Sequence, residues 1–143
     1  MVLELRASRV IVARLRPGDE VPGSLSALMV ERSIRGALVI MIGGLRSLEV
    51  GVFRQGGYDV RSYTAPEGQA IELTSAIGSL ALDERGNPSP HIHVTASLPD
   101  HTPVSGHLIR GVVWPLAEAF IIDLGEKLER AYDESIGLPA LAA

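Results

Sequence analysis

The sequence predicts an α+β fold, in which a mostly antiparallel sheet of seven or eight strands carries one main helix near the N-terminus. Short apolar and β-branched runs recur along the chain and are separated by turns rich in Gly, Pro and Asp. Clear helical spacing occurs in one early segment. The hydrophobic content of 46% supports a real core, and the length of 143 residues is that of one domain, residues 1–143.

The first two elements are a strand and the main helix. Residues 10–15 form a β-branched run that reads as a buried strand, and residues 16–20 (Arg-Pro-Gly-Asp-Glu) end it as a turn. Ser24 is a plausible N-cap, and the apolar residues that follow it keep helical spacing to about Ser33. This segment is the expected helix.

The middle of the chain is expected to form strands joined by tight turns. Residues 37–42 are an apolar run that predicts a buried strand, stopped by Gly43 and Gly44. Residues 48–53 and 58–63 flank Gln-Gly-Gly and predict a hairpin. Residues 70–82 predict a long strand, with a bend or bulge at Gly78.

The second half continues in the same way. The polar turn 83–88 leads to a strand over residues 90–98, and the turn 99–103 leads to a returning strand over residues 104–113. Residues 116–122 predict a final core strand, and residues 126–132 a short helix. The apolar end, residues 138–143, requires a surface to dock on.

Charge and composition exclude several classes of partner. The net charge is −4 and the pI about 5.5, which argues against DNA or RNA because such proteins carry excess Lys and Arg. The absence of cysteine removes disulfides and thiolate ligands. The longest apolar run, residues 37–45, is about half a membrane span, and the N-terminus lacks a signal-peptide pattern. We therefore expect a cytoplasmic protein without membrane contact.

All four histidines lie between residues 91 and 107. His91 and His93 project from the same face of the predicted strand, because side chains alternate along a strand. A hairpin centred on Asp100 would place His93 opposite His107, whereas a register shifted by one residue would turn His107 to the other face. His101 falls in the turn and is left out of the site.

Three imidazoles suit Zn²⁺ and would leave a fourth position open, as in catalytic zinc sites. Iron, nickel and manganese are alternatives. The alternative interpretation of the pattern is a polar strand face whose imidazoles bind no metal. Glu72, on the strand over residues 70–82, is the candidate acid or base of such a site, and a surface carboxylate is the alternative.

The order of these segments resembles the PPC (plant-and-prokaryote-conserved) domain family, a domain of unknown function in prokaryotes. The matching stretches cover nearly the whole chain: residues 16–20, 36–45, 48–53, Tyr63, 71–80, His91-Ile-His93, 106–108 (Gly-His-Leu) and 133–138. The resemblance implies an α/β fold with a mainly antiparallel sheet, a homotrimer, and a zinc-binding cluster of His91, His93 and His107. In land plants the domain follows AT-hook motifs with an Arg-Gly-Arg-Pro core, which this chain lacks.

Together these observations predict a stand-alone prokaryotic PPC-domain protein of unassigned activity. We expect a homotrimeric binding or assembly module with a three-histidine zinc site and a small-molecule ligand as possible partner. The alternative is a metal-dependent enzyme acting on a small polar substrate, with Glu72 as acid or base. DNA binding ranks last, because the chain is acidic and has no AT-hook.

Overall fold

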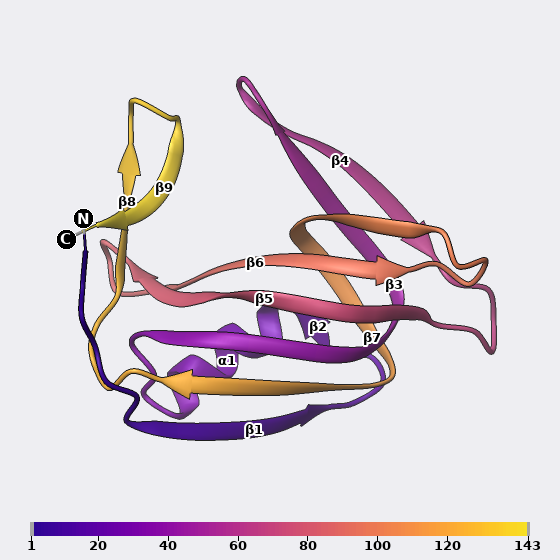
Figure 1. The fold of residues 1–143 in the computed structure, drawn as a ribbon, viewed down its shortest axis with the longest axis horizontal. Coiled ribbons are helices and arrows are strands. Elements are labelled where there is room, and N and C mark those ends of the chain that lie inside the picture. The colour runs from indigo at the N-terminus through magenta and orange to yellow at the C-terminus, as the bar shows by residue number, and fades with distance from the viewer. Residues whose placement is uncertain (1, 143) are drawn as a thin grey trace.

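A computed structural model describes residues 2–142 and forms one nine-stranded sheet with a single helix in that range, α1 (Gly23–Glu31) (Figure 1). The strands are β1 (Arg9–Leu15), β2 (Glu20–Val21), β3 (Ala37–Arg54), β4 (Gly57–Thr64), β5 (Ile71–Asp83), β6 (Pro88–Ser97), β7 (Pro103–Asp123), β8 (Glu129–Asp133) and β9 (Leu138–Ala142). All pairings are antiparallel except that of β5 with β8. The predicted fold class is confirmed, with nine strands instead of seven or eight.

The sheet is ordered β4-β3-β7-β6-β5-β8-β9, and β1 and β2 pair with β7. The long strands β3 and β7 pair over most of their length, and β3 also pairs with β5, so that β3, β5, β6 and β7 form a closed circuit. Two hairpins, β3–β4 and β8–β9, extend beyond this circuit as arms (Figure 1).

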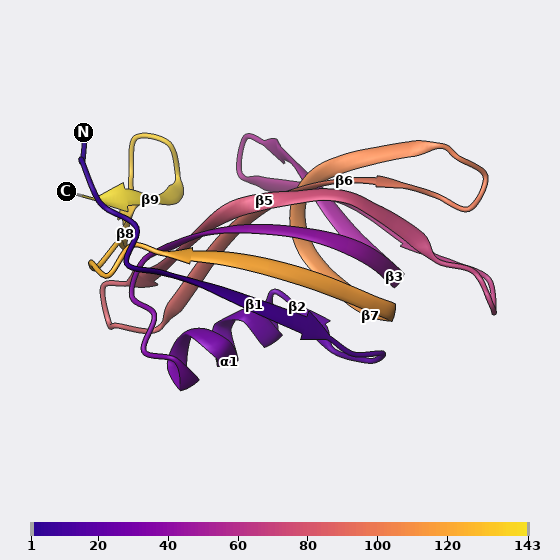
Figure 2. The ribbon, with the colours of Figure 1, turned by 60° about the horizontal axis from the view of Figure 1, so that its bottom comes forward.

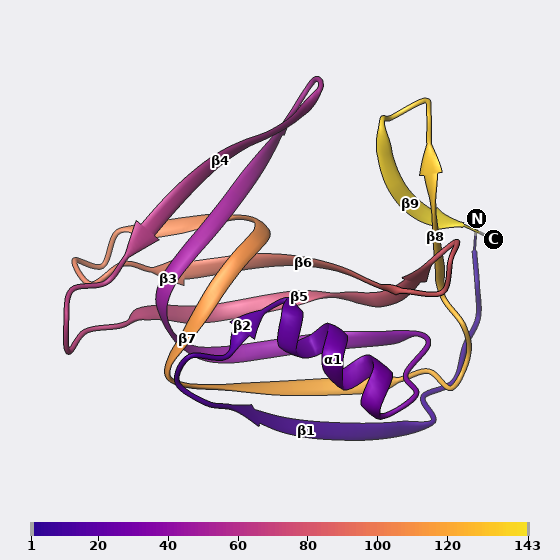
Figure 3. The ribbon, with the colours of Figure 1, turned by 180° about the vertical axis from the view of Figure 1, so that it is seen from behind.

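The core lies between α1 and the sheet face that it covers (Figures 2 and 3). Leu25 and Met29 of α1 are fully buried, as is every second residue in the first half of β3: Ala37, Val39 and Met41. This alternation is expected of strands with one face on a core. The helix begins at Gly23 after Pro22, and Ser24 makes no capping hydrogen bond.

The opposite face of the sheet is called here the outer face. Its apolar side chains are exposed: Val10 and Val12 of β1, Leu38, Ile40 and Ile42 of β3, Ile77 of β5, and Leu116 and Phe120 of β7. Figure 2 shows α1 on one side of the curved sheet and the two hairpins rising on the other.

The prediction that Gly43 and Gly44 end a strand is wrong, because β3 continues through them to Arg54. The glycines lie at shifts of register between β3 and its neighbours. A Cβ on Gly43 would lie 2.5 Å from the Ala117 Cα, and one on Gly44 would lie 2.4 Å from the Trp114 carbonyl oxygen. These glycines therefore allow β3 to lie unusually close to its paired strand β7 at the register shift. The predicted strands 37–42 and 48–53 are one strand.

Two further predictions near the C-terminus are corrected. Residues 116–122 are not a separate strand but the second half of β7. Residues 126–132 are not a helix, because β8 begins within them and pairs with both β5 and β9. Seven residues hold too few helical hydrogen bonds to compete with pairing to two strands. The apolar C-terminal segment docks as β9 on β8. The single helix in residues 2–142, α1, is not long and apolar enough to cross a membrane.

Candidate metal centre

The hairpin between β6 and β7 sets the positions of the three candidate ligands. Its turn is closed by two backbone hydrogen bonds between Leu98 and residues 101 and 102, of 2.8 and 2.9 Å, and the Thr102 N–H donates to the Asp100 carboxylate at 2.9 Å. In the resulting register His93 lies opposite His107. This is the register expected from a turn centred on Asp100.

His91, His93 and His107 converge on the outer face. One ring nitrogen from each lies within 4.8 Å of those of the others. The Nε2 atoms of His91 and His93 are 3.2 Å apart, and the ring centroids of the three histidines are separated by 5.0 to 5.7 Å. The structure thus brings together the three histidines selected from the sequence, with a separation that suits three ligands of one ion.

The His107 ring is held in place by Tyr58 of β4. The two rings stack with centroids 4.7 Å apart and planes 15° from parallel. Gly51, opposite His107 in the β3–β7 pairing, makes this stacking possible, because a Cβ there would lie 2.9 Å from the Tyr58 ring. Nδ1 of His107 is buried and has no hydrogen-bond partner among the described residues.

His91 and His107 favour the neutral form that binds metal. Burial lowers the pKa of His107 to about 4, and the positive charges of His91, His93 and Arg130 act in the same direction. The pKa of His91 is also lowered, first by burial and then by the charges of Arg130 and His93. Metal binding to these two histidines therefore competes little with protons near neutral pH.

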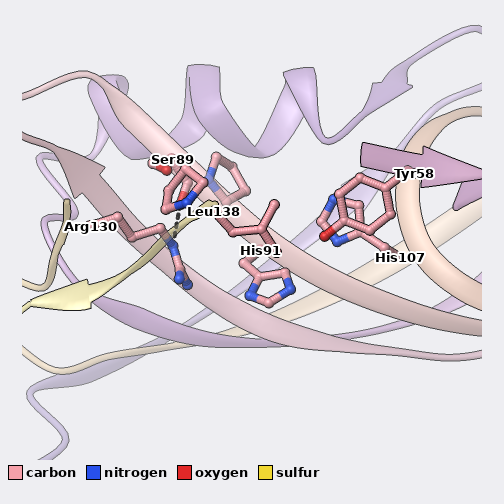
Figure 4. Close-up of a pocket in the computed structure, with 8 residues that line it drawn as sticks. Tyr58, Ser89, His91, His107, Arg130 and Leu138 are labelled. Carbon is pink, nitrogen blue, oxygen red and sulfur yellow. Dashed lines mark hydrogen bonds between the residues drawn. The ribbon is translucent and has the colours of Figure 1, made fainter. Parts of the chain in front are cut away.

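A pocket of about 180 Å³ opens beside the cluster (Figure 4). It lies between the two hairpin arms: β4 supplies Tyr58 and β9 supplies Leu138 and Pro139. Its remaining walls are Ser89, Pro90, His91, His107 and Arg130. Two of the three histidines therefore face a space that a small molecule can enter.

Arg130 and Tyr58 are site residues that the sequence did not reveal. Each comes from a hairpin arm far along the chain from the histidines, and neither stands in a motif with them.

Glu72 and His101 are not brought to the cluster. Glu72 is exposed on β5 opposite Ser97, four positions along β6 from His93. It neither lines the pocket nor belongs to the group of potential ligands. His101 is exposed in the turn, with a positive φ of 68°. Within the described chain, no carboxylate joins the three histidines as a ligand.

A sequence model of the Plants and Prokaryotes Conserved (PCC) domain matches residues 3–125. Among solved structures, a plant- and prokaryote-conserved protein from Pyrococcus horikoshii is 28% identical, with a TM-score of 0.89 over 100% of this chain and 98% of that chain. A metal-containing protein from Archaeoglobus fulgidus is 27% identical, with a TM-score of 0.88 over 100% and 99% of the two chains.

A candidate DNA-binding protein from Ralstonia eutropha is 25% identical, with a TM-score of 0.82 over 92% of this chain and 90% of that chain. A comparison with curated proteins found no match.

Proposed function

The chain belongs to the Plants and Prokaryotes Conserved (PCC) domain family, and from this we propose that it is a homotrimeric metal-binding module. His91, His93 and His107 would hold one divalent ion, with zinc as the first candidate. The fourth position would face a small ligand in the adjoining pocket.

The observation that carries the proposal is the convergence of three imidazoles, one of which has a buried ring nitrogen without a partner among the described residues. A buried polar atom without a hydrogen bond lowers the stability of the fold. A metal ion bound by the three rings would remove this penalty if Nδ1 of His107 is the ligand atom. The metal-containing protein from Archaeoglobus fulgidus, similar over the whole chain, supports the same assignment.

The outer face supports assembly with further copies of the chain. The outer face carries a continuous cross-strand row in which each residue is paired with the next: the apolar Val12, Phe120, Ile40 and Ile77, followed by His93 and His107. Exposed apolar patches of this extent mark interaction sites. The apolar members of this row are exposed in the described structure, whereas Tyr58 stacks on His107 at its end.

The surface area supports the same conclusion. The chain exposes 8367 Å², whereas a compact monomer of its mass would expose about 7,100 Å². The excess is of the order of one standard interface contribution, about 800 Å² per partner. We assign the occupant of the outer face to a second copy of the chain, because the apolar row is continuous and the projecting arms suit exchange between subunits.

A metal-dependent enzyme is the second candidate, favoured by the pocket that adjoins the histidines. A bound divalent ion would activate water or polarise a carbonyl group. His91 and His107 would present the ion to the pocket, and Tyr58 would hold the His107 ring in position. Glu72 lies outside hydrogen-bonding reach of the histidines within one chain, so an acid–base role for it would need another subunit.

DNA binding is the least favoured function. DNA binding is the role suggested for the similar protein from Ralstonia eutropha, not for this chain. This chain has a net charge of −4, and phosphate neutralisation requires the opposite sign.

Metal analysis of untagged protein after zinc supplementation tests the proposal. We expect about one zinc ion per chain, because a site of three converging histidines binds zinc tightly near neutral pH. His93→Asn removes one ligand and should abolish retention. His101→Asn, a matched change at an exposed histidine with a conformation that Asn tolerates, should leave it intact. Less than about 0.2 zinc per chain in the unaltered protein would contradict the proposal.

The same variants separate the two candidate functions. If the histidines serve assembly, His93→Asn should lower the oligomeric mass as well as the zinc content. If they serve catalysis, the mass should stay unchanged while turnover of small polar substrates disappears.

A further inference from the structure

Arg130 is a buried cation in an unusual position. It belongs to β8, its residue is 6% exposed, and its side chain extends beneath the β9 arm to the wall of the pocket (Figure 4). Its Nε donates to the Ser89 carbonyl oxygen at 3.2 Å, and Nη2 donates to the Ser79 hydroxyl. Both acceptors are neutral, so neither compensates the charge.

No carboxylate of the described residues forms an ion pair with Arg130. Burial lowers the pKa of Arg130, and no acidic group raises it. Of the five N–H groups of a guanidinium, two are used by Ser89 and Ser79. Nη1 donates to none of the described acceptors and is not sealed from solvent. The guanidinium can therefore accept an anion on its open side while it keeps both of these hydrogen bonds.

The free side of the guanidinium is next to the histidines. Ser79, which accepts from Nη2, is the cross-strand neighbour of His91, and such neighbours have Cβ atoms about 5 Å apart. Figure 4 shows the guanidinium and the His91 ring projecting to the same side of the sheet. The charge of Arg130 also lowers the pKa of both His91 and His107, as expected of a nearby cation.

The pocket itself limits what can fill this position. Its volume of about 180 Å³ is below the roughly 300–1,000 Å³ typical of pockets for drug-sized ligands, so its ligand is small. Pro90, Leu138 and Pro139 give the pocket an apolar lining beside the charged Arg130. A ligand of this pocket thus has an anionic end and a short apolar body. Inorganic phosphate offers the first but not the second.

We propose that Arg130 binds the carboxylate of a small organic acid in the pocket that it shares with His91 and His107. The planar guanidinium edge matches a carboxylate in geometry as well as charge. This inference rests on the proposed function, since it names the ligand class of the histidine centre. The acid would lie with its carboxylate on Arg130 and its carbon chain against Leu138 and Pro139.

Calorimetric titration of zinc-supplemented protein tests this inference. Butyrate is the probe because it combines one carboxylate with a short carbon chain. Butyramide serves as its neutral counterpart and inorganic phosphate as the competing anion, all in buffers free of other carboxylates. We expect butyrate to bind at least about tenfold more tightly than butyramide, as is typical when a charge-assisted pair is lost. Phosphate should bind more weakly than butyrate.

Variants assign the binding to Arg130. Arg130→Gln and Arg130→Lys should each weaken butyrate binding, the first by about tenfold or more and the second by less, because Lys keeps the charge but not the planar fork. Arg61→Gln removes the same charge from an exposed position on β4 and should change nothing. Thermal melts show whether each variant is folded, and Arg130→Lys remains informative if Arg130→Gln is not.

Equal binding of butyrate and butyramide to the unaltered protein would overturn the inference without any variant. Phosphate binding as tight as that of butyrate would overturn the assignment to a carboxylate. Unchanged butyrate binding in folded Arg130→Lys and Arg130→Gln would remove Arg130 from the site. In His93→Asn, which lacks a metal ligand, butyrate binding that still depends on Arg130 supports the inference even if the chain retains no zinc, so that the two proposals fail separately.

Discussion

His107 is the residue on which the most constraints meet. Tyr58 stacks on its ring, His93 lies directly across from it, and its Nδ1 is buried without a described partner. Burial and three neighbouring positive groups keep the imidazole neutral. A neutral ring that is already oriented loses little rotational freedom on binding an ion, so the fold prepares this ligand before metal arrives.

The pKa of His107 predicts how the metal-free protein responds to acid. Its pKa falls from 6.5 in the unfolded chain to about 4 in the folded one. Below pH 6.5 the unfolded chain therefore takes up a proton that the folded chain refuses. The free energy of unfolding should decrease as the pH falls from about 6.5 towards 4, and the lowered pKa of His91 acts in the same direction.

Urea denaturation of chelator-treated protein between pH 7.5 and 4.5, about the range in which histidine titrates, measures this effect. His107→Gln should flatten the dependence on pH, whereas His101→Asn should leave it unchanged. The explanation fails if the unaltered protein and His107→Gln lose stability in parallel.

At the scale of elements, β6 carries two ligands and must lie close to β5. Gly78 of β5 lies opposite Ile92 between the two histidines of β6. A Cβ at this glycine would lie 2.1 Å from the His91 carbonyl oxygen, a backbone atom that cannot turn away. The spacing of β5 and β6 at the site thus depends on the absence of a side chain at residue 78.

Gly78→Ala should therefore lower the free energy of unfolding by about 2 kcal/mol or more and weaken zinc retention. The reason is that the strands must separate at His91. Gly23→Ala is the control, because a Cβ there meets nothing within 4 Å and the residue has no positive φ. Thermal melts and zinc analysis of both variants check the prediction, which is contradicted if Gly78→Ala behaves like Gly23→Ala.

The hairpin of β6 and β7 could be predicted from the sequence because its determinants are local. A short turn between two prolines, centred on Asp100, sets the register, and the spacing of His91 and His93 sets their face. The continuation of β3 through Gly43 could not be predicted, since it depends on the close approach of the paired strand β7. A glycine pair alone is compatible either with the end of a strand or with a strand that continues close to its neighbour.

The same distinction explains the rest of the site. Tyr58 and Arg130 reach the histidines from two arms that meet only through the order of strands in the sheet. The segment 126–132 has helical spacing, but its backbone from Glu129 onwards forms β8 and pairs with β5 and β9. Local spacing identified the ligands, whereas the pocket around them is set by contacts distant in sequence.

At the scale of the whole molecule, the outer face predicts the state of assembly. Ile40 is at the centre of the apolar row and is 37% exposed in one chain. Ile40→Glu should leave the chain folded, because the side chain is outside the core, and should convert a trimer into monomers, because a charge buried between subunits is costly. The solution mass should fall by about threefold, to the 15.2 kDa of one chain.

Light scattering coupled to size-exclusion chromatography measures these masses. Val30→Glu is the control: Val30 is 69% exposed on α1, on the side of the molecule away from the outer face. Equal masses for the unaltered protein and both variants would place the interface elsewhere.

The cross-strand row ends in His93 and His107, so an assembly surface and a metal centre share the same strands. Two binding events that meet on one rigid element are thermodynamically reciprocal: any factor by which assembly raises metal affinity is the factor by which metal favours assembly. Dilution then acts like a weak chelator, and metal occupancy becomes a function of how much of the protein is present.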